Sequence, residues 1–441
     1  MDDERPFLSE PSTLALVHLN AYWFGLSYLW NGLGIILLPA LLMGLVPDAL
    51  KGTYLGALSF VGLVVTMLTQ PVAGAVSDRS GWLGRWGKRR PWMALGTAGD
   101  LLFLAGLALA ADFWVAAVAY VGLQVASGVA EAAFQSLLPD RVPNQHRGRG
   151  SGIKNALQIV GFIAGVGVGG WLAGRGRLDW AFAATGAALV VTLAWTAFGV
   201  REEPFLRPRR RSLAVGEALR RAFVHSFAFD RSQAPGYARL LVGRGLVLAG
   251  FYALQGFAQY FVADVLAVPN PVGTTAVLMA VMAAAVFLLA VPAGALADRL
   301  GRRPLTLFAV GLGAVATVLL MFVTSVSQLV VAGGLVGVAV GVFVSANWAW
   351  AADLVPPADA GRYLGLGNIA VAAASAFSRL LAGLIVDGGN AVRMGLGYQV
   401  LFVVLALGMA AGALALAGVP ETRPAARLLS ARPPTSTGAG D

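Results

Sequence analysis

Long blocks of consecutive apolar residues are the feature that most restricts what this chain can fold into. Of its 441 residues, 58% are apolar and 12% are charged, whereas soluble proteins average about 45–50% and about 25%. A helix that crosses a bilayer needs about 20 consecutive, mostly apolar residues. Continuous apolarity excludes a transmembrane β-barrel, whose strands alternate in segments of about 10 residues. We therefore predict an all-α membrane protein.

Twelve apolar blocks lie between clusters of proline, glycine and charged residues, and each is long enough for one crossing. The predicted transmembrane helices are 14–43, 52–77, 91–111, 113–138, 152–174, 180–200, 240–263, 272–297, 304–325, 328–352, 364–386 and 395–418.

The distribution of positive charge predicts the orientation of these spans. With a cytoplasmic N-terminus, 25 of the 32 lysines and arginines fall in cytoplasmic segments, and only Lys51, Arg175, Arg177 and Arg393 fall in outside loops. Because cytoplasmic loops carry an excess of Lys and Arg, we predict a multi-pass protein of the cell (inner) membrane with both termini in the cytoplasm. The same distribution explains the net charge of +10 without a nucleic-acid partner.

Several functional classes are excluded by what the sequence lacks. The chain has no cysteine, which excludes disulfides, thiolate nucleophiles and cysteine-ligated metals. It also contains no phosphate-binding loop, no HExxH motif and no recognisable nucleophile–base set. We therefore expect no enzymatic activity, no cofactor and no bound metal, and any transport is expected to be driven by a gradient.

An internal repeat divides the chain into two halves. The segment Pro71–Arg79 recurs as Pro292–Arg299. A glycine, an aspartate and an arginine in the first copy each lie 220 positions before the same residue in the second copy. A second segment, Asp140–Asn155, recurs 213 positions later as Asp353–Asn368. The repeat predicts two pseudo-symmetric six-helix bundles. The predicted domains are an N-terminal bundle at 1–200, an Arg-rich cytoplasmic linker at 201–239, a C-terminal bundle at 240–418 and a cytoplasmic tail at 419–441.

The repeated loop resembles a known family signature. The first copy reads Gly-Ala-Val-Ser-Asp-Arg over 74–79 and Gly-Lys-Arg-Arg-Pro over 87–91, and the second reads Gly-Ala-Leu-Ala-Asp-Arg-Leu-Gly-Arg-Arg-Pro over 294–304. Both resemble the loop motif of the major facilitator superfamily, which lies between spans 2 and 3 and between spans 8 and 9. The resemblance implies the major facilitator fold, whose two bundles rock about a substrate site near the middle of the membrane.

A narrower resemblance comes from the segments Ser77–Trp92 and Gln135–Gly148, which are similar to the sucrose-transporter-like and glycoside–pentoside–hexuronide cation symporter branches. The chain departs from these branches within span 4. Gln124 stands where some of them carry an acidic residue, and Glu131 stands where glutamine is usual.

The repeated loops are predicted to act as gates. Asp78 lies at the cytoplasmic end of span 2, where it can accept hydrogen bonds from a helix N-terminus and pair with an arginine. The alternative is that arginines at the membrane surface only anchor the helices. The residues assigned to the gating loops are Gly74, Asp78, Arg79, Arg89, Arg90, Gly294, Asp298, Arg299, Arg302 and Arg303.

Five charged residues fall within the predicted spans: Asp100, Glu131, Lys154, Arg244 and Arg379. Lys154 and Arg244 lie near cytoplasmic ends, so we expect their side chains to reach the surface. The other three lie deep, where charged residues usually face a cavity or a partner.

Glu131 and Asp100 are the predicted proton-coupling residues. Glu131 shares one face of its helix with Gln124, Ser127 and Gln135, and a carboxyl group in a cavity can take up and release a proton. The alternative for both is a structural, hydrogen-bonded carboxyl. Arg379 is predicted either to bind substrate or to form an ion pair with Asp353 or Asp387.

Polar and aromatic residues inside the spans predict the substrate site. Spans 1, 4, 7 and 10 line the cavity in the superfamily that the chain resembles, and amides and aromatic rings suit a sugar. The alternative for the aromatic residues is the interfacial belt. The predicted substrate-binding residues are Asn31, Trp23, Gln124, Tyr252, Gln255, Gln259, Asn347, Trp348 and Arg379.

These features favour a secondary active transporter, and the family resemblance favours proton-coupled symport of a sugar or glycoside. The expected partners are therefore a small-molecule substrate, protons or another cation, and the lipid bilayer. One alternative is a proton-driven exporter of drugs or small metabolites, which could use Glu131 equally well. A second is a non-transporting membrane assembly factor, against which the polar residues within the spans argue.

Overall fold

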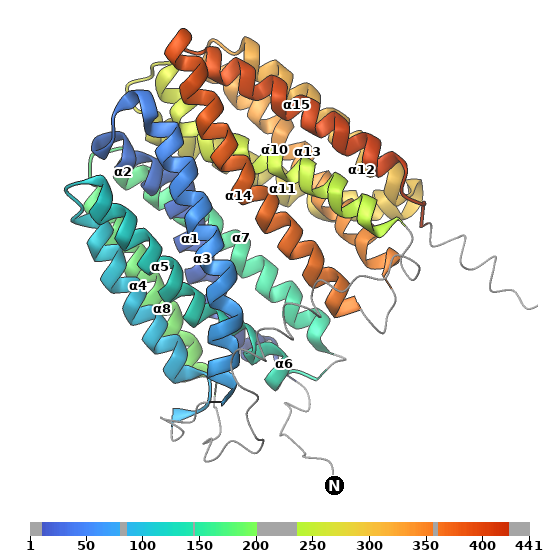
Figure 1. Ribbon diagram of the computed structural model, residues 1–441. Helices are drawn as coiled ribbons and strands as arrows, with labels where there is room; N and C mark the ends of the chain where they lie inside the picture. Colours follow the sequence, from blue (N-terminus) through green and yellow to red (C-terminus); the bar gives the residue numbers. More distant parts are fainter. Residues whose placement is uncertain (1–10, 80–85, 144–145, 201–235, 356–359, 423–441) are drawn as a thin grey trace, which may run out of the picture.

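The computed structural model describes residues 11–79, 86–143, 146–200, 236–355 and 360–422, and all secondary structure in these ranges is helical (Figure 1). Within them, twelve helical segments are long and apolar enough to cross a membrane. The predicted fold class is confirmed. Helices suit these sequences because they satisfy every backbone hydrogen bond internally, as a bilayer requires.

The first six spans form the N-terminal bundle. They are α1 (Thr13–Gly32) with η1 (Leu33–Leu37) and α2 (Leu38–Leu45), α3 (Lys51–Arg79) after the short turn η2 (Asp48–Leu50), α4 (Arg90–Ala108), α5 (Phe113–Gln135) with the short α6 (Leu137–Arg141), α7 (Arg147–Ala173) and α8 (Leu178–Gly199).

The last six spans form the C-terminal bundle. They are α10 (Tyr237–Asp264), α11 (Pro271–Leu300), α12 (Arg302–Leu319) with η5 (Leu320–Phe322), α13 (Val326–Leu354), α14 (Ala360–Val392) and α15 (Leu396–Ala417). The predicted linker at 201–239 lies outside the described residues up to 235, and its last residues, from Tyr237 on, already belong to α10.

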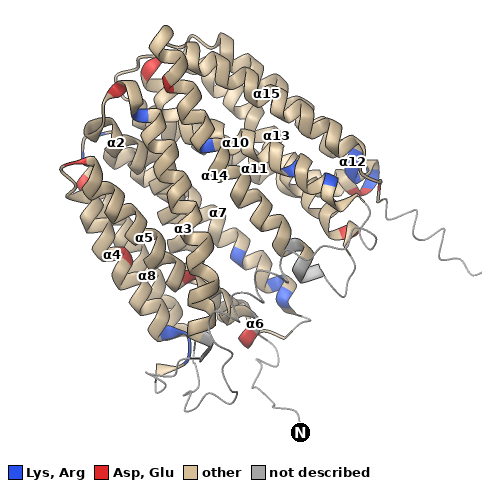
Figure 2. Ribbon diagram, in the orientation of Figure 1, with Lys and Arg blue, Asp and Glu red and all other residues tan. Residues whose placement is uncertain are grey.

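The two bundles pack against each other mainly along α3 with α14 and α7 with α11. Because the number of spans is even, α1 begins and α15 ends on the same side of the molecule, which we call the terminal face; the other side is the opposite face. Figure 1 shows that the bundles lie close together near the opposite face and spread apart toward the terminal face. Most charged residues lie near helix ends (Figure 2).

The internal repeat is visible in the structure. Arg89 pairs with Asp140 at 3.2 Å in the N-terminal bundle, and Arg302 pairs with Asp353 at 3.3 Å in the C-terminal bundle. Both pairs span 51 residues. The two bundles therefore use the same ion pair to hold their third and fourth spans together at the terminal face.

The first span is interrupted by the π-helical turn η1, which precedes Pro39. Proline has no backbone N–H and disturbs the regular hydrogen bonding of a helix. Gln259 of α10 compensates: with its amide oriented to match both partners, it donates to the carbonyl of Ile36 (3.2 Å) and accepts from the N–H of Ala40 (3.1 Å). A side chain of the C-terminal bundle thus supports the irregular backbone of the N-terminal one.

Two helices begin earlier than predicted, and this changes the environment of two charged residues. α7 begins at Arg147 and α10 at Tyr237, so Lys154 and Arg244 each lie about two turns inside a helix. Arg244 is 8% exposed. The Lys154 ammonium lies 3.8 Å from the centre of the Trp23 ring. The prediction that these side chains reach the surface is wrong for Arg244, and Lys154 is directed toward an aromatic ring.

Candidate functional site

A cavity of about 320 Å³ lies between the two bundles. Helices α1 and α7 line it from the N-terminal bundle, and α10, α11 and α13 line it from the C-terminal bundle. Eleven of its sixteen lining residues are apolar, and the five others are Ser27, Asn31, Gln158, Tyr252 and Gln255. Mostly apolar walls with a few polar groups are typical of small-molecule sites.

Two of these polar groups already hydrogen-bond within the N-terminal bundle. The Asn31 amide donates to the backbone carbonyl of Ser27 at 2.8 Å, and the Ser27 hydroxyl donates to the carbonyl of Gln158 at 2.6 Å. Tyr252 and Gln255 of α10 lie on the other wall and are about one turn apart. In the described part of the chain, the side chains of Ser27 and Asn31 therefore take part in more hydrogen bonds than those of Tyr252 and Gln255.

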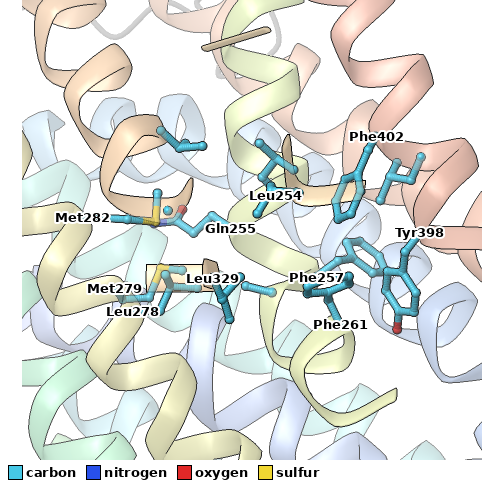
Figure 3. Close-up of a pocket in the computed structure, with 15 residues that line it drawn as sticks. Leu254, Gln255, Phe257, Phe261, Leu278, Met279, Met282, Leu329, Tyr398 and Phe402 are labelled. Carbon is cyan, nitrogen blue, oxygen red and sulfur yellow. The ribbon is translucent and has the colours of Figure 1, made fainter. Parts of the chain in front are cut away.

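A second cavity of about 40 Å³ extends into the C-terminal bundle (Figure 3). It shares Gln255, Met279 and Met282 with the larger cavity, and its other labelled walls are mainly aliphatic and aromatic. Figure 3 shows Gln255 beside Met282, so this amide lies where the two spaces meet. Flexible methionine side chains adapt to differently shaped apolar molecules.

The predicted substrate residues fall into two groups. Asn31, Tyr252 and Gln255 line the larger cavity. Trp23 is buried against Phe134, with 5.2 Å between ring centres, and Gln124 accepts a 2.5 Å hydrogen bond from Thr66. Neither of these two residues is part of the cavity wall.

The remaining predicted substrate residues lie on α10, α13 and α14. Gln259 is fully buried at the irregular first span, where it bridges the bundles. Asn347 is buried, and its amide finds no hydrogen-bond partner among the described residues. Trp348 lies under the guanidinium of Arg244, 4.8 Å from ring centre to Cζ. A substrate role for any of these residues stays a prediction.

The two predicted proton-coupling carboxyls lie inside the N-terminal bundle. Asp100 of α4 is fully buried, and neither of its carboxyl oxygens has a hydrogen-bond partner within the described part of the chain. Glu131 of α5 accepts a 2.7 Å hydrogen bond from Gln135, and it interacts electrostatically with both Asp100 and Lys154. Tyr22 is near both carboxyls and hydrogen-bonds Thr97 at 2.7 Å.

A polar seal at the opposite face, formed by Lys51, Asp264, Tyr398 and Asp387, is a feature that the sequence analysis missed. Lys51 at the start of α3 forms a 2.6 Å ion pair with Asp264 at the end of α10, and the Tyr398 hydroxyl donates to the same carboxylate at 2.6 Å. Asp387 of α14 accepts hydrogen bonds from the N–H groups of Gly52 (3.1 Å) and Thr53 (2.5 Å). A carboxylate at a helix N-terminus is stabilised by the helix dipole.

Close backbone contact extends this seal. A Cβ atom at Gly383 would overlap the carbonyl oxygen of Gly52, and one at Gly56 would overlap that of Arg379. The signal in the sequence was a lysine and two aspartates near span ends that were predicted to face the outside. Their pairing depends on which spans meet, and periodicity within one helix does not give that information.

The gating loops are described in part. The side chains of Asp78 and Arg79 lie outside the described residues. Arg302 pairs with Asp298 at 2.7 Å as well as with Asp353, and Arg89 pairs with Asp140. These ion pairs join helices of one bundle rather than the two bundles in this conformation, so a gating role for the loops stays a prediction.

No group of three or more His, Asp or Glu side chains in the described ranges is arranged to hold a metal ion. The described side chains do provide a cavity between the bundles, buried carboxyl groups and contacts that join the two bundles.

Comparisons with known proteins identify the family to which this architecture belongs. The sequence profile of the Major Facilitator Superfamily matches residues 21–269 and 240–439. The tetracycline resistance protein, class G, of Vibrio anguillarum is 32% identical over 147 residues, which are 32% of this chain and 35% of that protein. The chain thus matches about a third of that relative's length. The narrower resemblance to sucrose and glycoside symporters is not confirmed by these matches.

Solved structures share the fold at low sequence identity. The nucleoside transporter NupG superposes with a TM-score of 0.68 at 14% identity and covers 92% of this chain and 98% of its own. A bacterial homologue of the human lysosomal transporter Spinster, in an inward-facing and unoccupied conformation, gives 0.69 at 15% identity over 91% of this chain and 96% of its own. With the profile matching nearly the whole sequence, the chain belongs to the Major Facilitator Superfamily and is a multi-pass membrane protein of a secondary-transporter family.

Proposed function

We propose that the protein is a proton-coupled secondary transporter for a small organic molecule with a largely apolar body. The observation that carries this proposal is the cavity between the bundles, in which eleven of sixteen lining residues are apolar. A site that recognises a sugar needs many free hydrogen-bonding groups, whereas only five lining side chains are polar and two of them, Ser27 and Asn31, are already hydrogen-bonded within their own bundle.

The seal supports alternating access. It closes the opposite face through the Lys51–Asp264 ion pair and the Asp387 cap of α3, while the bundles spread toward the terminal face (Figure 1). If the terminal face is cytoplasmic, as the charge distribution predicts, this conformation is inward-facing. Transport then requires these contacts to break and contacts at the terminal face to form.

Proton coupling is assigned to Asp100 and Glu131. A carboxyl group buried in the membrane is costly to leave ionised and unpartnered, so such groups usually serve a pathway or a proton relay. The electrostatic contact between Glu131 and Lys154 gives the ionised form of Glu131 a partner. Protonation of Glu131 would release Lys154, which links proton uptake to rearrangement within the N-terminal bundle.

The apolar cavity is suited to drug-like molecules. The similarity to a tetracycline resistance protein, which covers about a third of that protein, supports export of such molecules. Sugar uptake is the second candidate, because Asn31, Tyr252 and Gln255 of the predicted sugar site do line the cavity.

Transport by purified protein in proteoliposomes distinguishes these functions. The vesicles are given a pH gradient and supplied either with radiolabelled sugars or with apolar-bodied organic molecules that are anionic, neutral or cationic. We expect gradient-dependent movement of at least one apolar-bodied compound and no movement of sugars. Gradient-dependent sugar uptake would favour the second candidate, and absence of any transport would contradict both.

A further inference from the structure

Two arginines of the C-terminal bundle lie inside helical spans and have no carboxylate partner among the residues that the structure describes. Arg244 of α10 is 8% exposed and Arg379 of α14 is partly buried. The Nε atoms of both are buried and find no hydrogen-bond partner within the described ranges. The titratable groups that interact electrostatically with them are tyrosines: Tyr120 and Tyr252 with Arg379, and Tyr237 and Tyr252 with Arg244.

Most other buried basic side chains in the described ranges are paired; Arg90, whose Nε is also buried without a hydrogen-bond partner there, lies at the first residue of α4, at the terminal face. Lys51, Arg89 and Arg302 are each at most 11% exposed, and each has a carboxylate oxygen within 3.3 Å. Lys154 interacts electrostatically with Glu131. Removing a cation from water without a partner is unfavourable, so two arginines that lie well inside helical spans without a carboxylate partner among the described residues require an explanation.

Arg379 lies at the junction of the two bundles, eight residues and therefore about two turns along α14 from Asp387 of the seal. Its backbone contacts Gly56 of α3, and its guanidinium is near Tyr120 of the N-terminal bundle and Tyr252 of the C-terminal bundle. A Cβ atom at Gly256 would lie 3.5 Å from Nε, and one at Gly34 would lie 3.8 Å from Nη1. A Cβ atom at either glycine would therefore be in ordinary van der Waals contact with the guanidinium. Arg379 is not itself a lining residue of the cavity, but Tyr252, with which it interacts, is.

We infer that the transported molecule is an organic anion, and that Arg379 binds its acidic group while the apolar cavity holds its body. This inference rests on the proposed transport function and specifies the substrate class. A planar guanidinium matches a carboxylate or sulfonate with two parallel hydrogen bonds. Bound substrate would supply a negative charge that no described residue places beside Arg379.

Arg244 extends this site toward the terminal face. It lies on the same helix as Tyr252, eight residues and therefore about two turns away, and its guanidinium stacks over Trp348. Both arginines interact with Tyr252. An anion that enters from the terminal face would be attracted first by the positive charge of Arg244. It would then reach Arg379, which lies nearer the sealed opposite face.

Binding of matched probes to the purified full-length protein in detergent tests this inference without requiring transport. The probes are 1-naphthoate, 1-naphthamide and 1-naphthylmethylammonium, which share one ring system and differ in charge. We expect naphthoate to bind about tenfold or more tightly than the amide, and Arg379→Gln to remove this preference. The control Arg393→Gln changes an exposed arginine at the opposite face and should leave the preference intact.

A second pair of variants guards against misfolding. Arg379→Lys keeps the positive charge and should retain part of the preference for naphthoate, and Arg244→Gln should weaken naphthoate binding less than Arg379→Gln does. Equal binding of naphthoate and naphthamide by the wild-type protein, binding of neither, or an anion preference that survives Arg379→Gln would overturn the inference.

Vesicle transport separates the failure of this inference from that of the proposed function. Transport of neutral or cationic compounds by a protein without anion preference would overturn the substrate class alone. Anion binding without any transport would overturn the proposed function and leave Arg379 as a binding residue.

Discussion

The N-terminal and C-terminal bundles share a scaffold and differ in the charges of their interiors. Both hold their third and fourth spans together with the same Arg–Asp pair at the terminal face. Inside, the N-terminal bundle contains the carboxyls Asp100 and Glu131, whereas the C-terminal bundle contains the arginines Arg244 and Arg379. The two bundles therefore share the ion pair of the repeated loops. They differ in the charged residues of their interiors, which are not repeated.

The repeat allows each interior charged residue to be compared with the equivalent position in the other bundle. The offset of 213 residues places Gly313 opposite Asp100, Val344 opposite Glu131 and Val166 opposite Arg379. The fold thus accepts an uncharged residue at each of these three positions in the other half. We propose that the N-terminal bundle handles the proton and the C-terminal bundle the substrate.

The largest expected effect is that of Glu131→Gln on coupling. The amide resembles a protonated carboxyl in shape but cannot release a proton, so the variant should lose gradient-driven accumulation and keep substrate exchange. Accumulation and counterflow are measured in the same proteoliposomes, with Asp179→Asn as the control because the Asp179 side chain is 66% exposed. Full accumulation by the Glu131 variant would move the proton site to Asp100.

The seal between the bundles gives the next largest effect. Asp387→Asn weakens charge-assisted hydrogen bonds worth roughly 1.5–3 kcal/mol, so conformations open at the opposite face should become about 10–100 times more populated. The chain has no native cysteine, so Ser59→Cys on α3 can report this opening through labelling by an impermeant thiol reagent. Ser59 is 1% exposed in the closed seal.

Asp48→Asn is the matched control for the seal. Asp48 also approaches Lys51, at 3.5 Å, but its side chain is 87% exposed. Exposed ion pairs contribute about 0–1 kcal/mol, so labelling of the Ser59→Cys background should hardly change. Similar labelling in the Asp48 and Asp387 variants would mean that the seal does not control access.

The fold was predictable because its signals are local. Apolar block length gave the twelve helices, and the loop repeat gave the two related halves. The interior site was less predictable because contacts between bundles depend on helix rotation and pairing. Gln255 and Gln259 were both predicted to bind substrate, yet Gln255 lines the cavity and Gln259 bridges to the first span.

The same limit explains why Arg244 was misjudged. Sequence distance from a predicted helix end suggested that its side chain could reach water, but α10 begins earlier and Trp348 of α13 covers the guanidinium. Lys51 was assigned to an outside loop, and its role in the seal was not predicted. Its partner, Asp264, is 213 residues away, and no pattern within one segment could reveal that pair.

A smaller effect is expected from Asp100→Leu, which tests whether the N-terminal carboxyl is kept for function. Both oxygens of Asp100 are buried without a partner among the described residues, and leaving a buried polar group unsatisfied costs about 1–3 kcal/mol. The variant should therefore unfold at a higher temperature in detergent while it loses part of its pH-gradient dependence. A lower unfolding temperature would show that Asp100 has a stabilising partner and is structural.

The smallest effect is expected for Gln255, which can contribute one uncharged hydrogen bond from the cavity wall to the substrate. Gln255→Ala should raise the apparent KM for the transported compound about two- to tenfold, because a single hydrogen bond contributes about 0.5–1.5 kcal/mol. Gln259→Ala, one turn away, removes a contact between α10 and the irregular first span and should lower thermal stability instead. Initial rates and unfolding temperatures measured on both variants separate the two roles. Equal effects on KM would mean that both glutamines face the substrate, whereas an unchanged KM in the Gln255 variant would place the substrate deeper, beside Arg379.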